Sequence, residues 1–251
     1  MKDSKKIDIC GVFVDDLSKE GAVEKIFSLA KGKRGNLVVT VNSEFVMLAR
    51  RNPRFSQILR KAELALADGG WVAFLKLILG GNARNRITGV DLVDLVCKQS
   101  AKRPVRIGFL GGFGSVAETV AKRQKIKYPG LNVVFFEAGD PSTNYDSKIR
   151  TKLARAGRID VLFVAFGMGK QEFWMERNRN FANIGVFIGV GGAFDYLSGI
   201  KRRAPRLLQA IGLEWLWRLL MEPARIWRMR VLPAFFVLSL FFVISKKLKI
   251  S

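Results

Sequence analysis

Asn36-Leu37-Val38-Val39-Thr40-Val41-Asn42-Ser43 begins the stretch that decides the fold, and Ala67-Asp68-Gly69-Gly70 ends it. An apolar, β-branched run stops at small polar residues, a helical region follows, and a second short apolar run ends in Asp-Gly. Ligands of open α/β sheets bind outside the carboxyl ends of the strands. We therefore expect Thr40, Asn42 and Asp68 to line one cleft. The alternative is that Asn42-Ser43 only caps a helix and Asp68-Gly69 only forms a turn.

Strand patterns and helix patterns alternate through most of the chain. This alternation predicts an α/β fold, a Rossmann-like wound parallel sheet with helices on both faces. Residues 1–199 are expected to form this catalytic domain, and residues 200–251 a basic and apolar C-terminal appendage that is helical and binds a membrane. The other predicted strands cover residues 7–14, 105–110, 133–136, 160–166 and 185–190.

The charge balance points to an anionic partner. The 251 residues contain 43 Lys and Arg against 21 Asp and Glu, a net charge of +22. From residue 201 onward there are eleven basic residues and two acids, beside the longest apolar run, which favours a membrane over nucleic acid. Basic loops interleaved with aromatic residues, which grip single-stranded nucleic acid, are not evident.

The sequence contains no histidine, which narrows the chemistry. This excludes a His-based triad, His-ligated zinc and a His general base, so proton transfer falls to a carboxylate, Lys, Tyr or Cys. Cys10 and Cys97 lie far apart in apolar settings and are expected to be reduced core residues. No apolar segment follows the charged N-terminus, so we expect no signal peptide and a cytoplasmic protein.

The chain changes character after Gly199. A basic loop at residues 201–203 precedes an amphipathic helix predicted over 205–221. The uncharged run 231–245 has fifteen residues, fewer than the ~20 that a membrane-spanning helix needs. We expect this run to dip into one leaflet, with its basic flanks on anionic headgroups. The alternative is a C-terminal helix of the core.

Three turns with glycines follow predicted strands. The stretch from Gly112 to Ala117 matches the G-x-G-x-x-A dinucleotide fingerprint, and Glu137 ends the next strand about where a ribose-binding acid would lie. Two later turns place Gln171 and Asp195 at helix starts, where polar side chains can hold a nucleotide or a sugar. The alternative for each turn is structural, with glycine for the bend and acids that complement a helix dipole.

Arg218, Arg225 and Arg228 form a fourth candidate group. They fall on one helical face if the helix bends through Pro223. A guanidinium cluster beside a membrane-seeking segment suits a lipid-linked diphosphate. The alternative is a solvated or headgroup-binding basic face.

Taken together, these stretches resemble the WecG/TagA/CpsF glycosyltransferase family from about residue 7 to residue 230. Gly169 is a departure, because the family usually has Pro at this position before Lys-Gln-Glu. The motifs that carry the resemblance are, in order, residues 40–42 (Thr-Val-Asn), 67–69 (Ala-Asp-Gly), 86–92 (Arg-Ile-Thr-Gly-Val-Asp-Leu), 167–172 (Gly-Met-Gly-Lys-Gln-Glu) and 189–195 (Gly-Val-Gly-Gly-Ala-Phe-Asp).

The resemblance implies an inverting transfer from a UDP-sugar that needs neither a metal nor another cofactor. The family donor is commonly UDP-N-acetylmannosamine or its uronic acid, and the acceptor is N-acetylglucosamine on undecaprenyl diphosphate. Asp68 takes the position of the general base. The donor-site positions are Thr40, Asn42, Arg86, Gln171 and Asp195, and the positions for the acceptor diphosphate and the leaving nucleotide are Arg218, Arg225 and Arg228.

Such an enzyme is expected at the cytoplasmic face of the cell membrane, in the synthesis of cell-surface polysaccharide or teichoic acid. A homo-oligomer that buries apolar surface is compatible with the sequence. Displacement at an anomeric carbon needs a base and positive charge on the departing UDP, and Asp68 and the arginines are the available groups.

Two functions of other classes stay open from the sequence. An NAD-dependent oxidoreductase would use the stretch from Gly112 to Ala117 and Glu137, although no His or Tyr-x-x-x-Lys pair is evident as the acid for hydride transfer. A basic membrane-binding protein without enzymatic activity would use the C-terminal charge and apolar run alone.

Overall fold

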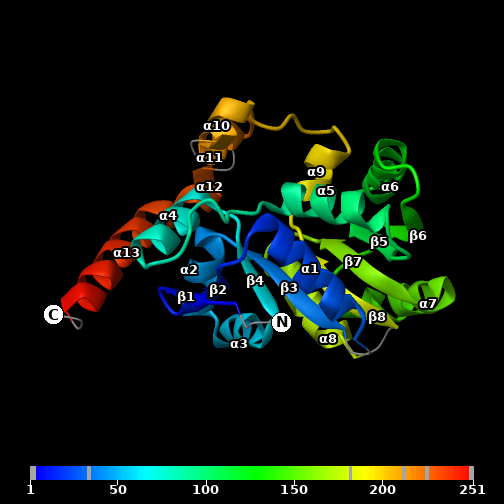
Figure 1. Cartoon of the computed structure of the whole chain (residues 1–251), viewed down its shortest axis with the longest axis horizontal. Helices are drawn as coiled ribbons and strands as arrows, with labels where there is room; N and C mark the ends of the chain where they lie inside the picture. The colour runs from blue at the N-terminus through cyan, green and yellow to red at the C-terminus, as the bar shows by residue number, and fades with distance from the viewer. Residues whose placement is uncertain (1–3, 33–34, 181–182, 211–212, 224–225, 249–251) are drawn as a thin grey trace.

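A six-stranded parallel sheet forms the centre of the computed structural model, which describes residues 4–32, 35–180, 183–210, 213–223 and 226–248. The strand order is β4-β3-β8-β7-β5-β6 (Figure 1). Apart from the edge strand β6, the strands are almost fully buried, as expected for a sheet covered on both faces, and most of them are rich in β-branched and aromatic residues. They are β3 (Asn36–Val41), β4 (Leu64–Ala67), β5 (Arg106–Gly111), β6 (Asn132–Glu137), β7 (Ile159–Ala165) and β8 (Ile184–Gly189).

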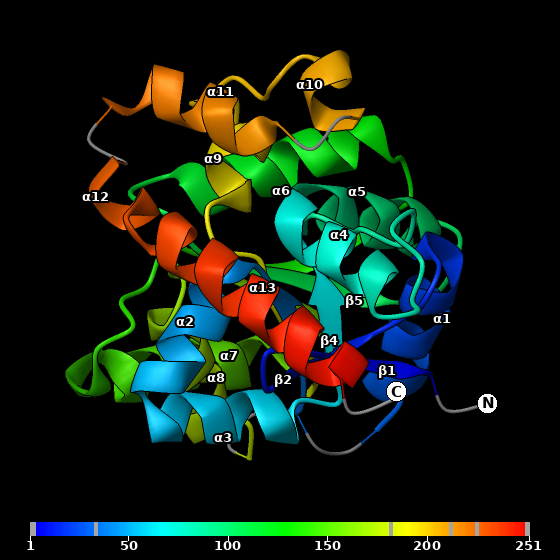
Figure 2. The ribbon, with the colours of Figure 1, turned by 90° about the vertical axis from the view of Figure 1, so that its left-hand side faces the viewer.

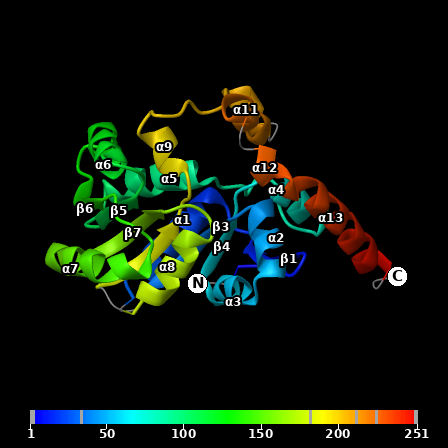
Figure 3. The same ribbon diagram turned by 180° about the vertical axis from the view of Figure 1, so that it is seen from behind.

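Helices cover both faces of this sheet (Figures 1 and 3). They bury two separate apolar cores. One core is closed by α2 (Ser43–Arg51), α3 (Pro53–Lys61), α4 (Gly70–Ile78), α7 (Asp146–Ala156) and α8 (Lys170–Asn178). The other is closed by α1 (Lys19–Ala30), α5 (Gly89–Ser100), α6 (Val116–Lys127) and α9 (Ala193–Leu197). The predicted α/β fold with a wound parallel sheet is therefore confirmed.

The prediction of one strand over residues 7–14 is wrong. This segment is an antiparallel hairpin of β1 (Lys6–Ile9) and β2 (Val12–Asp15), separate from the main sheet. Cys10 and Gly11 both have positive φ, 53° and 92°, and the Asp8 carboxylate accepts a hydrogen bond from the Gly11 N–H at 2.7 Å. Alternating apolar residues look the same in one long strand and in two short ones, so the pattern did not reveal the turn.

The predicted helix over 205–221 is also wrong in one respect. The described residues form two helices, α10 (Arg206–Ala210) and α11 (Glu214–Met221). Next come α12 (Ile226–Met229) and α13 (Val231–Leu248), so the described part of this region has no continuous helix through Pro223.

One face of α13 packs on the protein, and the other is exposed. Phe235 and Ser239 are buried, and the Trp71 side chain on α4 donates from Nε1 to the Ser239 hydroxyl oxygen at 3.3 Å. Phe236 and Phe241, in contrast, are 50% and 67% exposed. Figure 2 shows α13 crossing in front of α2 and α4. In the described part of the chain, α13 included, we find no helix with both the length and the apolar character needed to cross a bilayer.

Candidate active site

The carboxyl ends of the parallel strands meet at a cavity of about 310 Å³, here called the polar cavity. Thr40 and Asn42 reach it from the end of β3, and Asp68 from the end of β4. The predicted convergence of these three residues is confirmed. Gln171 and Asp195, which were predicted from the later turns, line the same cavity.

A second cavity of about 530 Å³, here called the apolar cavity, adjoins the first. Asn42, Glu44, Asp68 and Arg218 line both, so the two cavities meet at these side chains. The walls of the apolar cavity come from α4, α11 and α13, and include Trp71, Trp215, Leu219, Leu232, Phe235 and Phe236. The site therefore combines a polar chamber, an apolar chamber and carboxylates where the two meet.

Asp68 is one of two acids that line both cavities, and Glu44 is the other. Its backbone N–H donates to the Val41 carbonyl oxygen at 2.9 Å, which fixes it against the end of β3. Burial raises the pKa of the Asp68 carboxyl, and the positive charges of Arg218 and Arg86 offset only part of that rise. A carboxylate with a raised pKa is a better general base than an exposed one.

Asn42 and Thr40 are held by local hydrogen bonds. The Asn42 Oδ1 accepts from the Phe45 backbone N–H at 3.1 Å and so caps α2, while Asn42 also lines both cavities. The Thr40 hydroxyl donates to the Gly189 carbonyl oxygen of β8 at 3.1 Å. Asn42 therefore caps α2, as the structural alternative predicted, and its side chain still lines the cavity.

A chain of buried hydrogen bonds stands behind the polar cavity. The Gln171 side chain donates from Nε2 to Oε1 of Glu172 at 2.6 Å and accepts at Oε1 from the Gly191 N–H at 2.9 Å. The other Glu172 oxygen accepts from the Gly169 N–H at 2.7 Å. Burial raises the pKa of Glu172 to about 7, although its hydrogen bonds lower it.

Asp195 is paired with a lysine that the sequence presented only as part of a basic loop. Lys201 Nζ lies 2.9 Å from Asp195 Oδ2 and 3.2 Å from Glu222 Oε1, and all three residues line the polar cavity. Burial lowers the pKa of Lys201, but the hydrogen bonds to the two acids outweigh this and the net shift is upward. Arg218 lies over the Tyr196 ring at 5.1 Å and also lines the polar cavity, so the described residues supply two cationic side chains there, Lys201 and Arg218.

Arg86 lines the apolar cavity, whereas the resemblance placed it in the donor site. Its Nε donates to the Asp68 carbonyl oxygen at 2.7 Å and its Nη1 to the Gln209 carbonyl oxygen at 3.0 Å, while Nη2 pairs with Glu214. All three guanidinium nitrogens thus bind the protein. In the structure Arg86 supports Asp68 and the C-terminal helices.

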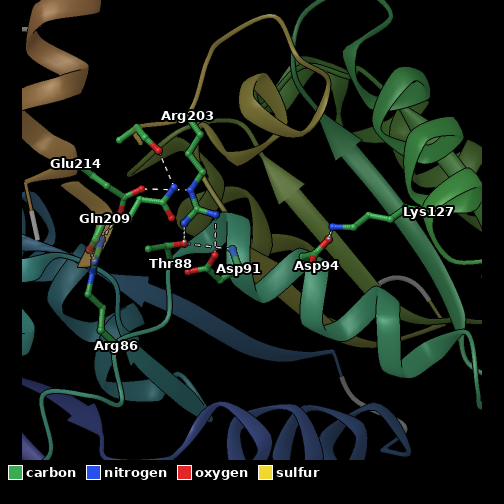
Figure 4. A network of polar contacts seen from close by, with 9 residues as sticks. Arg86, Thr88, Asp91, Asp94, Lys127, Arg203, Gln209 and Glu214 are labelled. Atoms are coloured by element: carbon green, nitrogen blue, oxygen red, sulfur yellow. Dashed lines mark hydrogen bonds and ion pairs between the residues drawn. The ribbon is translucent and has the colours of Figure 1, made fainter. Parts of the chain in front are cut away.

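Glu214 joins this arginine to a second one (Figure 4). The Glu214 side chain is buried, and its Oε1 accepts from Arg203 Nε at 3.3 Å. Arg203 also binds Asp91 Oδ1 at 2.7 Å and donates to the Thr88 hydroxyl oxygen at 3.2 Å. This network anchors α11 to the start of α5 and so places Arg218 over the polar cavity.

The match to known proteins identifies the family. The model of the Glycosyl transferase WecG/TagA/CpsF family matches residues 7–249. The chain belongs to this family. It is therefore a glycosyltransferase, and the oxidoreductase alternative is not supported.

Two relatives carry the same name, N-acetylglucosaminyldiphosphoundecaprenol N-acetyl-beta-D-mannosaminyltransferase. The protein of Bacillus spizizenii (strain ATCC 23059 / NRRL B-14472 / W23) is 32% identical over 202 residues, which cover 80% of this chain and 77% of the relative. The protein of Staphylococcus aureus (strain MW2) is 28% identical over 232 residues, which cover 92% of this chain and 90% of the relative.

The stretch from Gly112 to Ala117, which matches the dinucleotide fingerprint, has a structural role in this glycosyltransferase. Gly112 lines the polar cavity, but Glu137 pairs with Lys152 at 2.5 Å and lines neither cavity. Gly112 has a φ of 75°, and a Cβ there would lie 2.7 Å from a Val116 methyl carbon. The glycine is thus required by the tight turn between β5 and α6, which is the structural alternative.

Two of the predicted residues fall wholly or partly outside the part of the chain that the structure describes. Arg225 lies outside the described residues. Arg228 belongs to α12, but its side chain is not among the described ones. Within the described residues, no group of three or more His, Cys, Asp or Glu side chains is arranged to hold a metal ion.

Proposed function

We propose that this glycosyltransferase moves N-acetylmannosamine from UDP-N-acetylmannosamine to the N-acetylglucosamine of a polyprenyl-diphosphate-linked acceptor. The uronic acid of N-acetylmannosamine, or a related hexose, is the alternative donor sugar. The observation that carries the proposal is the position of Asp68 and Arg218 where the polar and apolar cavities meet. The names of the relatives support the choice of sugar and acceptor.

The polar cavity suits the donor. UDP carries a diphosphate that needs positive charge as it departs, and Lys201 and Arg218 supply it. Thr40, Asn42, Gln171 and Asp195 provide hydrogen-bonding groups for the sugar and the nucleotide. Arg225 and Arg228 are proposed, from the family resemblance, to add to the charge around the acceptor diphosphate and the leaving UDP. Arg86, proposed for this site from the resemblance, would act through its bond to the Asp68 carbonyl.

The apolar cavity suits the acceptor, because the first units of a polyprenyl chain need an apolar wall. The acceptor hydroxyl would then approach the sugar from the Asp68 side. Asp68 takes the hydroxyl proton as the oxygen bonds to the anomeric carbon. The bond from that carbon to UDP breaks on the opposite face, and UDP leaves with the electron pair. Attack from the face opposite the leaving group inverts the configuration.

We propose that the reaction needs no metal. Two side-chain cations in the polar cavity provide the charge that a divalent ion supplies in other transferases. Activity is therefore expected to persist after treatment with EDTA and to gain nothing from added magnesium. Loss of transfer on chelation, with recovery on adding metal, would contradict this.

We also propose that the protein acts on the cytoplasmic face of the membrane, where UDP-sugars are made. The exposed apolar residues of α4 and α13, including Phe74, Leu77, Phe236 and Phe241, support contact with lipid. Co-sedimentation with anionic vesicles should weaken in a Phe241→Ser variant. A homo-oligomer stays an expectation, which the mass in solution would test.

A panel of UDP-sugars with a lipid-linked N-acetylglucosamine acceptor tests the function. UDP-N-acetylmannosamine should give a lipid-linked disaccharide and free UDP in equal amounts. Transfer from none of the UDP-sugars would refute the proposal. Preference for the uronic acid donor would support the proposed transfer reaction but replace N-acetylmannosamine by its uronic acid as the transferred sugar.

A further inference from the structure

Glu172 is a buried acid that has no part in the proposed transfer. Its side chain has no exposure to solvent and lies in the first turn of α8. Burying a carboxylate is costly unless it is hydrogen-bonded, and here each of its two oxygens accepts one bond. Complementing the helix dipole does not require burial, so the position needs another reason.

These bonds connect two turns that line the polar cavity. Gly167 and Met168 come from the turn between β7 and α8, and Gly191 and Gly192 from the turn between β8 and α9. Glu172 binds the first turn at the Gly169 N–H, and through the Gln171 amide it reaches the second turn. Both ends of that amide have a partner, so its orientation is set.

We propose that Glu172 is a positioning residue that holds Gln171 and the two glycine turns in the geometry that receives the UDP-sugar. The inference rests on the proposed donor site. A carboxylate can accept from both N–H donors, whereas a glutamine has only one acceptor oxygen and would turn its NH₂ toward one of them. Glutamine at this position would therefore release either Gly169 or Gln171.

The neighbouring strand is adapted to this arrangement. A Cβ at Gly189 would lie 2.8 Å from Gln171 Nε2 and 2.9 Å from Glu172 Oε1. Both distances are too short for a carbon in van der Waals contact, so only glycine leaves room for the pair. Gly189 also accepts the bond from Thr40, which joins the pair to the end of β3.

Protonation of Glu172 has a defined consequence for the cavity. The pKa of about 7 comes from burial, opposed by the bonds from Gln171 and Gly169. A proton on either oxygen removes one acceptor, so the two-bond arrangement belongs to the ionised form. Donor affinity is therefore expected to fall as the pH drops through about 7.

The other charged groups around α8 have partners of their own or lie away from Glu172. The strands β3 and β8 contain no ionisable side chain, and Asp160 of β7 pairs with Arg158 at 3.1 Å. The remaining charged side chains nearby are Arg54 over the Phe173 ring, Lys61 and Arg179 with Glu176, Arg177 and Arg150 with Asp146, and the exposed Arg60 and Lys170.

Protonation of the acids that line the polar cavity would change donor binding in the opposite direction to protonation of Glu172. Glu44, Asp68, Asp195 and Glu222 carry negative charge toward the donor. Their protonation would strengthen the binding of an anionic UDP-sugar, because it removes like-charge repulsion. Weaker binding at lower pH therefore distinguishes Glu172 from these groups.

The test compares Glu172→Gln with the wild type and with Glu176→Gln, a matched change on the same helix. The dissociation constant of UDP-N-acetylmannosamine is measured by calorimetry without acceptor, between pH 6 and pH 8.5. At pH 8 Glu172→Gln should bind about tenfold more weakly, a difference of about 1.4 kcal/mol, and Glu176→Gln should bind like the wild type. The wild-type constant should rise as the pH falls through about 7, and that of Glu172→Gln should stay flat.

Thermal unfolding separates positioning from loss of the fold. At pH 8 Glu172→Gln loses a hydrogen bond but also a buried charge, so its unfolding midpoint at that pH should stay within a few degrees of the wild type. Equal donor affinity of Glu172→Gln and wild type at pH 8 would overturn the inference about Glu172 and leave the proposed function standing. A wild-type affinity that does not weaken at low pH would do the same. Failure of the wild type to bind any UDP-sugar would overturn the proposed function, and the inference with it.

Discussion

Replacing Glu214 by Gln should loosen the hold of the C-terminal helices on the sheet domain. Glu214 is 5% exposed, and it accepts from Arg86 with one oxygen and from Arg203 with the other. Glutamine keeps one acceptor oxygen and loses the charge. Arg86 and Arg203 retain their bonds to Asp68, Gln209, Asp91 and Thr88, so neither guanidinium is left without a partner.

The expected loss is about one charge-assisted hydrogen bond. Such a bond contributes roughly 1.5 to 3 kcal/mol, so the docking of α11 should weaken by about 2 kcal/mol. Because 1.4 kcal/mol corresponds to a factor of ten, the ratio of docked to undocked helix should fall about 30-fold. Arg218 follows Glu214 by one turn of α11 and leaves the polar cavity when this helix lifts.

The assay is kcat/KM for the lipid-linked acceptor, together with protease cleavage between residues 199 and 205. Glu214→Gln should lower kcat/KM by up to about 30-fold and speed the cleavage. Glu118→Gln serves as the control, since its pair with Lys122 is 2.7 Å long but solvent-exposed and is worth less than about 1 kcal/mol. Wild-type kcat/KM and cleavage rate in Glu214→Gln would refute the reasoning. A second check is the Arg86→Gln, Glu214→Gln double variant. Its loss in kcat/KM, expressed as a free energy, should be smaller than the sum of the losses of the two single variants.

Asp68→Asn should lower kcat by about 10²- to 10⁴-fold, because it removes the base. It should not weaken UDP-sugar binding, because it also removes a negative charge. Rapid turnover by this variant in a single-turnover assay would exclude Asp68 as the base. Lys201→Met should weaken donor binding by about tenfold through the loss of one charge-assisted bond to the diphosphate, and an unchanged dissociation constant would remove Lys201 from the donor site. A chain ending at Gly199 should lose activity on the lipid-linked acceptor, and full activity would show that the appendage is dispensable. The pKa of Glu172 is raised to about 7 from an ordinary 4.5, so the folded state holds the proton of the Glu172 carboxyl more tightly than the unfolded state does. The stability that protonated Glu172 contributes is therefore present below pH 4.5 and is lost as the pH rises through about 7. The free energy of unfolding of the wild type relative to Glu172→Gln should therefore fall by about 3 kcal/mol from pH 4.5 to pH 8, whereas a constant difference in denaturant titrations would contradict the pKa.

The sequence by itself determined the layered fold and the strand ends of the site. Apolar periodicity, glycine turns and caps are local properties, and each acts within a few residues. The polar tips after β3 and β4 therefore predicted Thr40, Asn42 and Asp68 at one edge of the sheet, since parallel strands end on the same side. Capping could not be excluded from the sequence, and Asn42 does cap α2.

Only the tertiary structure decided which distant groups meet. Arg86 and Glu214 are 128 residues apart, yet their pairing makes Arg86 a support for Asp68 and α11. The same folding brings Lys201 between Asp195 and Glu222 and leaves Glu172 without exposure, although the sequence showed Lys201 only as part of a basic loop and Glu172 only as an acid at a helix start. Burial and ion pairing depend on the packing of elements far apart in the chain, and no local pattern records them. The pKa of an acid and the partner of a cation therefore became known only when the chain was folded.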